Sequence, residues 1–136
     1  AIAAQMRDAG MRVKRTNLPG ATFWNDWDKY PFSASEWQGR PLGVQVYSLA
    51  YRSGAPWSET AFANAEFDRL LDQATSLADP QARSQVMAQL QTILRDEGGI
   101  LQPYWRSVYR SFHPRVQGLG AHQAHRQFLE RVWIAA

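Results

Sequence analysis

Two amphipathic helices are predicted by the stretch AFANAEFDRLLDQATSLADPQARSQVMAQLQTILRDEGG, residues 61–99. Apolar side chains recur at helical spacing in two runs, residues 61–77 and 86–94, so each run offers one apolar face. Asp79 suits the N-cap of the second helix, and Pro80 suits its first turn, where the missing N–H breaks no hydrogen bond. Two glycines end the second run. The other predicted elements are arranged around this helical pair.

Shorter elements are predicted on both sides of the pair. Further helices are expected at residues 2–9, 22–30 and 42–51. Short strands are expected at residues 11–15, 32–37 and 100–105, with 107–112 as an extension of the last. Residues 128–134 suit either a strand or a helix. Helices separated by short strands are typical of an α/β or α+β domain, and we assign the chain to the α/β class.

The composition limits the classes of function. At 136 residues the chain has the size of one domain with a sizeable core, and its 45% apolar residues argue against disorder. It has no cysteine, which excludes thiol chemistry, and no apolar run approaches the ~20 residues of a membrane span. The net charge is +3, but basic residues are spread among acidic ones, whereas a nucleic-acid surface needs a concentrated basic stripe.

Tryptophan is concentrated in residues 24–68, which hold four of the six in the chain. Within this stretch, Trp37 and Arg40 lie three residues apart at the end of a predicted strand. An aromatic plate beside a guanidinium suits a ligand that has a flat or apolar part and an anionic part. The structural alternative is that Trp37 belongs to the core and that Arg40 pairs with Glu36 or Asp28.

Three further positions in the stretch have two interpretations each. Glu36 is a candidate partner for a cationic part of a ligand, or a solvated acid. Trp57 follows a Gly-Ala-Pro loop and either caps a ligand cleft or covers a helix. Trp24 and Trp27 share one helical face, and we expect them to be core residues.

The sequence contains no recognisable catalytic or metal-binding constellation. His113, His122 and His125 lack cysteines or carboxylates at ligand spacing, so we expect them to be surface histidines and no metal to be bound. No Ser-His-Asp order, paired catalytic carboxylates or phosphate-binding glycine loop can be assembled. We therefore expect neither enzymatic activity nor a cofactor.

Three motifs in the second half of the chain occur in an order found in one protein family. They are NAEFDRLL at 64–71, ADPQAR at 78–83 and EGGILQPY at 97–104. In combination they resemble the C-terminal part of the family-5 extracytoplasmic solute-binding proteins. These are the dipeptide, oligopeptide and nickel type of receptors for ABC transporters. The resemblance covers nearly the whole chain.

The resemblance implies a place for this chain within a larger fold. Family members fold as two α/β lobes, the type II periplasmic-binding-protein fold, and close on a solute between them. Residues 1–105 would form the C-terminal segment of the second lobe, and residues 106–136 would cross the hinge and pack on the first. The partners implied are a missing N-terminal portion of the same protein, an ABC transporter permease and a solute, in the periplasm.

The resemblance also bears on the ligand site. In peptide-binding members an aspartate that pairs with the amino terminus of the peptide follows the strand tryptophan, and Arg40 stands at the matching place here. Trp105 would lie near the hinge, where it is a further candidate contact. The function implied is a receptor for a peptide-like or anionic organic solute. The alternative is a small basic module that binds single-stranded nucleic acid through its aromatic and arginine residues.

Overall fold

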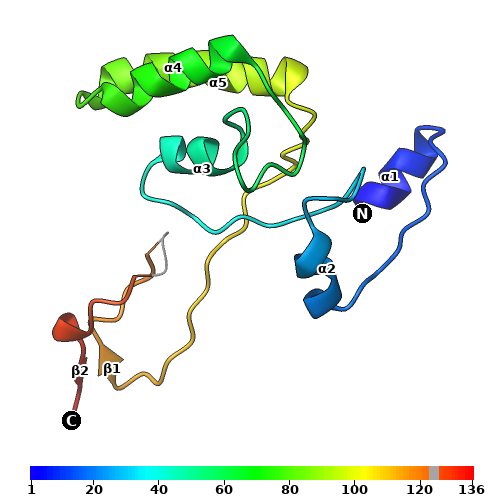
Figure 1. Cartoon of the computed structure of the whole chain (residues 1–136). Coiled ribbons are helices and arrows are strands. Elements are labelled where there is room, and N and C mark those ends of the chain that lie inside the picture. Colours follow the sequence, from blue (N-terminus) through cyan, green and yellow to red (C-terminus); the bar gives the residue numbers. More distant parts are fainter. Residues whose placement is uncertain (123–125) are drawn as a thin grey trace.

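The computed structural model describes residues 1–122 and 126–136, and Figure 1 shows the arrangement of their elements. These residues form helices α1 (Ile2–Asp8), α2 (Gly20–Asp26), α3 (Gly43–Ala50), α4 (Ala65–Ser76) and α5 (Pro80–Glu97), the 3-10 helix η1 (Leu129–Arg131), and strands β1 (Val116–Gln117) and β2 (Trp133–Ile134). Helices α4 and α5 lie side by side, α3 lies beneath them, and a long extended segment leads from α5 to β1 (Figure 1).

The α4–α5 pair confirms the sequence prediction. The Asn64 side chain accepts a hydrogen bond of 2.9 Å from the backbone N–H of Phe67, and Asp79 accepts one of 2.7 Å from that of Ala82. Both side chains therefore satisfy a backbone donor that a helix start leaves unpaired. Helix α4 begins later than predicted, at Ala65, because its N-cap Asn64 has an extended backbone with a φ of −148° and Ala61 has a left-handed φ of +51°.

The core lies between α3, α4 and α5. It consists of Val44, Ala50, Tyr51, Phe62, Phe67, Leu70, Leu71, Ala74, Val86, Leu90 and Leu94. The largest fully buried side chains are Phe67, Leu71 and Leu90, which come from both long helices. The apolar face predicted for each helix is thus the face that the other helix covers.

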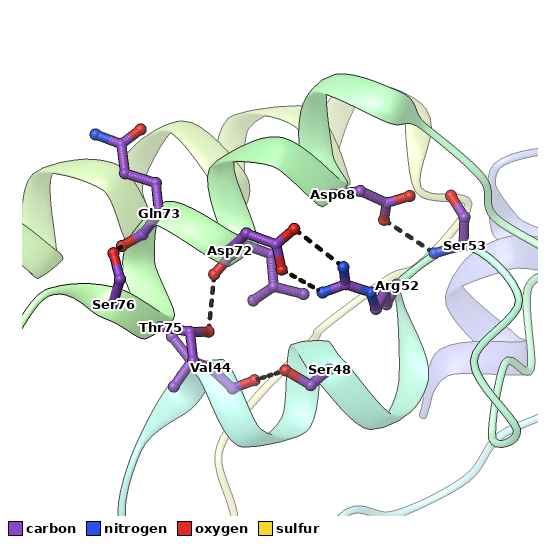
Figure 2. Close-up of polar contacts among 10 residues, drawn as sticks. Val44, Ser48, Arg52, Ser53, Asp68, Asp72, Gln73, Thr75 and Ser76 are labelled. Carbon is purple, nitrogen blue, oxygen red and sulfur yellow. Dashed lines mark hydrogen bonds and ion pairs between the residues drawn. The ribbon is translucent and has the colours of Figure 1, made fainter.

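Polar contacts join the loop after α3 to α4 (Figure 2). Arg52 donates two hydrogen bonds to Asp72, of 2.6 and 3.0 Å, in a parallel bidentate pair. The backbone N–H of Ser53 donates to Asp68 over 3.0 Å. These bonds fix the loop after α3 against α4, so the segments that follow α3 start from a defined position.

The other predicted helices are confirmed with shifted ends. Helix α3 matches the prediction at 42–51, and α1 matches the one at 2–9. Helix α2 begins two residues earlier than predicted and ends at Asp26, four residues before the predicted end. None of its residues is buried, so no apolar core holds a longer helix in place.

The strand predictions at 11–15, 32–37, 100–105 and 107–112 are wrong for the described residues. These segments have no strand assignment there, and the sheet found is two-stranded, with Val116 opposite Ile134 and Gln117 opposite Trp133. The segment predicted at 128–134 contains both η1 and β2. A strand exists only when its backbone hydrogen-bonds to a neighbouring strand, and the residues of a segment do not specify that neighbour. The observed fold is therefore mixed helical with one small sheet, which is compatible with part of an α/β binding protein.

The C-terminal segment extends away from the helices. Residues 101–112 contain several exposed apolar or aromatic side chains, and the chain then folds back so that β2 pairs with β1 (Figure 1). Gly118 has a φ of +79°, and a Cβ there would lie 1.8 Å from the carbonyl oxygen of Arg131, so only glycine fits this turn. The division at 105/106 stays a prediction. Among the described residues, no helix is long and apolar enough to cross a bilayer.

Candidate functional site

An open pocket of about 390 Å³ lies between α2, the extended segment before α3 and the loop after α3. Its lining consists of Trp24, Trp27, Glu36, Trp37, Gln38, Arg40 and Trp57. Four of the five residues selected from the sequence are thus brought together. The fifth, Trp105, is not in the lining and is 88% exposed. That these residues bind a ligand stays a prediction.

The four tryptophans of the lining form a continuous row of rings, which we call the tryptophan row. The centroid distance is 6.0 Å from Trp24 to Trp27, and 5.9 Å both from Trp27 to Trp37 and from Trp37 to Trp57. The interplanar angles are between 51° and 70°, within the tilted and edge-to-face arrangements that aromatic rings prefer. The row links three separate segments of the chain into one aromatic wall.

The expectation that Trp24 and Trp27 are core residues is wrong. Neither belongs to the buried cluster; Trp24 is 48% exposed and Trp27 is half-buried. Their common helical face was predicted correctly, but that face lines the pocket. No local signal in the sequence separates the two roles, because a face that lines a pocket and a face that joins a core have the same helical spacing of apolar residues.

Trp37 combines the two interpretations given for it. It is half-buried and packs against the helical core, and it also lines the pocket. Its indole N–H donates a hydrogen bond of 3.0 Å to Oε1 of Glu59, and the Ser35 hydroxyl donates to Oε2 of the same carboxylate. A carboxylate acceptor makes these bonds stronger than neutral ones. Sequence reasoning missed Glu59, which lies 22 residues from Trp37 with no local motif to join them.

Behind this arrangement lies the buried phenol of Tyr51. Burial first, and then the negative charge of Glu59, raise the pKa of Tyr51 to about 12. The phenol is therefore neutral across the physiological range. Glu59 accepts its two hydrogen bonds from Ser35 and Trp37, and the neutral phenol of Tyr51 places no second negative charge near it.

The charges at the pocket are distributed unequally. Glu36 forms an ion pair with Arg106, from the extended segment 70 residues later. Among the described residues Arg40 is exposed and makes no ion pair, so the alternative in which it pairs with Glu36 or Asp28 is wrong. The lining thus presents an unpaired guanidinium, while its carboxylate already has a cationic partner.

The histidines do not assemble a metal site in the part of the chain that is described. No group of three or more His, Cys, Asp or Glu side chains there could hold a metal ion. The ring of His113 accepts a hydrogen bond from the backbone N–H of Arg115, and His122 packs edge-on against Phe128 at 5.7 Å. His125 lies outside the described residues, so the expectation of no metal stays a prediction.

A second, smaller pocket of about 230 Å³ lies in the C-terminal segment. Its lining consists of Gly118, Leu119, Gly120, Ala121, His122, Phe128 and Arg131. The ring of Phe128 contacts two guanidinium groups, at 5.4 Å from Arg126 and 4.9 Å from Arg131. The ring of Phe128 is thus already engaged in cation–π contacts with side chains of the same chain. None of the residues selected for ligand binding lies in this pocket.

Comparison with known proteins gives one informative result. No protein-family model matches the chain. The chain is similar to the dipeptide-binding protein DppE of Bacillus subtilis (strain 168), with 28% identity over 115 residues. The similarity covers 83% of this chain and 21% of that protein, so the chain spans about a fifth of the relative's length. The relative is named for dipeptide binding, and the chain is similar to one part of it.

Proposed function

We propose that this chain is part of an extracytoplasmic receptor for an ABC importer, which binds a peptide-like or anionic organic solute between two lobes. The observation that carries the proposal is the open pocket, in which Glu36 is paired with Arg106 while Arg40 has no acidic partner among the described residues. The similarity to a dipeptide-binding protein over most of the chain supports it. On this proposal the pocket is one wall of a cleft, and the other wall comes from the remainder of the receptor.

Each residue selected from the sequence has a role under this proposal. Trp37 gives the solute an apolar contact, Arg40 holds an anionic group, and Trp57 covers the pocket from the loop after α3. Glu36 contributes through its ion pair with Arg106 rather than as a cation partner of the solute. Trp105 is adjacent to Arg106 and contacts solute only when the cleft closes. Closure follows because the solute binds the closed form more tightly than the open one.

The C-terminal segment would pack on the first lobe. Residues 106–136 contain five arginines and one acidic residue, Glu130, so the segment holds the positive excess of the chain. Large apolar side chains such as Tyr109 and Ile134 are exposed on it. A surface with both features suits a partner that is apolar at its centre and acidic around it.

The periplasmic location and the permease follow from the same proposal. Binding of single-stranded nucleic acid has no supporting observation and is not proposed.

The test uses the complete protein that contains this chain, with the Arg40→Ala substitution. Calorimetry against a panel of dipeptides, tripeptides and organic acids first identifies a solute for the native protein. Arg40→Ala should then weaken binding by about tenfold or more, because it removes a charge-assisted hydrogen-bonding group.

Arg69→Ala provides the matched control, because Arg69 is exposed on α4 and pairs with Glu66 outside the pocket. Its affinity should equal that of the native protein. Unchanged affinity in Arg40→Ala would remove Arg40 from the site. X-ray scattering of the complete protein should show that it becomes more compact when a solute binds. If no member of the panel causes this closure, the receptor proposal is wrong.

A further inference from the structure

We infer that the solute carries an aromatic ring and a carboxylate together, as a peptide with an aromatic residue at its carboxyl end does. The inference rests on the proposed function and defines the class of solute. It comes from the tryptophan row, from the hydrogen bonds of Trp37 and from the charges around Arg40.

The ends of the tryptophan row have free ring surface. Trp24 is 48% exposed and Trp57 is 44% exposed, although each contacts the next ring of the row. Both residues line the pocket, so their exposed rings form part of its wall. An exposed aromatic wall binds a flat apolar group because contact removes apolar surface from water on both sides.

One of the two inner rings of the row, that of Trp37, has no free hydrogen-bond donor. The indole nitrogen of Trp37 has one N–H, and that N–H is bound to Glu59. Trp37 therefore offers the pocket carbon surface, in an orientation fixed by its bond to Glu59, whose other oxygen accepts a bond from Ser35. This preorganisation reduces the entropy lost when a ring binds.

The polar part of the pocket selects an anion. The Glu36 carboxylate is paired with Arg106, whereas the Arg40 guanidinium has no acidic partner among the described residues. A guanidinium binds a carboxylate through two parallel hydrogen bonds, and it repels an ammonium group. A sugar would need partners for several hydroxyl groups, and Gln38 is the one amide in the lining. A ring with a carboxylate therefore fits the wall better than an amine or a sugar.

The experiment measures binding of five probes to the complete protein by calorimetry. The probes are Ala-Phe, Ala-Phe amide, N-acetyl-Ala-Phe, Ala-Ala and glucuronate. Removing the carboxylate in the amide, or the ring in Ala-Ala, should each weaken binding by about tenfold or more. Acetylating the amine should change the affinity by less than about threefold, because Glu36, the carboxylate of this lining, is already paired with Arg106.

Variants assign each preference to its residue. Arg40→Gln should abolish the preference for Ala-Phe over its amide, and Trp24→Ala should reduce the preference for Ala-Phe over Ala-Ala. Phe32→Ala is the control for the latter, because Phe32 is exposed and does not line the pocket. It should leave both preferences unchanged.

Among the binding comparisons of the five probes, three outcomes overturn the inference. They are equal binding of the acid and the amide, loss of binding on acetylation, and tighter binding of glucuronate than of Ala-Phe. Closure of the protein on other solutes, with none of the Ala-Phe series bound, overturns the inference and leaves the receptor proposal intact. Failure to close on any solute overturns both.

Discussion

At the scale of single residues, Trp37 owes its orientation to a carboxylate far away in the sequence. Glu59 accepts the indole N–H with one oxygen and the Ser35 hydroxyl with the other. Since the three residues are half-buried, an unpaired N–H or hydroxyl there would lose much of its hydration without compensation. Glu59 is therefore a positioning residue for Trp37, one of the two inner rings of the tryptophan row.

Replacing Glu59 by alanine should release the Trp37 side chain. In a proton–nitrogen correlation spectrum the indole N–H signal of Trp37 should move upfield and exchange faster with water, because its carboxylate acceptor is gone. Glu59→Gln keeps an acceptor oxygen and should restore most of the signal position. Glu66→Ala removes an exposed acid on α4 and serves as the control. An unmoved Trp37 signal in Glu59→Ala would contradict the positioning role.

The sequence allowed part of this site to be predicted, for a physical reason. Glu36, Trp37 and Arg40 fall within five consecutive residues, so any backbone conformation keeps them near one another. The partners that decide their chemistry are distant: Glu59 is 22 residues from Trp37, and Arg106 is 70 residues from Glu36. Such pairings depend on how α3 and the extended segments pack, which no local pattern encodes.

At the scale of elements, the helices were predictable because their start signals are local. Asp79 accepts the hydrogen bond from Ala82 that caps α5, three residues along the chain. The strands were not predictable in the same way. Residues 11–15 and 32–37 alternate or contain β-favouring side chains, yet hydrogen-bonded pairing requires a second segment in register, and none pairs with them among the described residues.

The cap of α5 can be tested by substitution. Asp79→Ala should lower the free energy of unfolding by about 1 kcal/mol, the usual effect of removing an N-cap side chain. Asp79→Asn retains an oxygen acceptor and should stay close to the native value. Denaturant titrations of the three proteins provide the measurement. Equal losses in both variants would show that the hydrogen bond to Ala82 contributes nothing to stability.

At the scale of the whole molecule, the packed helices α3, α4 and α5 support the open pocket that the tryptophan row lines. Helices α3, α4 and α5 enclose the core, and the pocket lies where the segments on either side of α3 meet α2. The bidentate contact of Arg52 with Asp72 holds the loop that leads from α3 toward Trp57 (Figure 2). The stability of the three-helix core and the position of Trp57 in the pocket are thus connected through this loop.

This connection should depend on pH. Hydrogen bonding from Arg52 lowers the pKa of Asp72 below its ordinary value of 3.8. A carboxyl with a lowered pKa in the folded state adds stability above its unfolded pKa and loses it as the pH falls through the folded pKa. The native chain should therefore exceed Asp72→Asn in unfolding free energy at about pH 7, and the gap should close toward about pH 2.

Paired denaturant titrations at the two pH values measure that gap. The difference will be small because the pair is exposed to solvent. High salt at neutral pH should also reduce the difference in unfolding free energy between the native chain and Asp72→Asn, because salt screens exposed charges. A gap that widens on acidification would contradict the assignment of Asp72 as the titrating group.

The tryptophan row has an optical consequence. Indole rings whose centres are 5.9–6.0 Å apart exchange excitation energy before they emit light, so the four rings should behave as one coupled chromophore rather than as four separate ones. Their emission should be strongly depolarised even in a rigid solvent, and their ultraviolet circular dichroism should show paired bands of opposite sign. A solute that settles on any one ring would therefore change the light emitted by all four. Solute binding to the pocket should therefore be measurable from the intrinsic tryptophan fluorescence, without an added label.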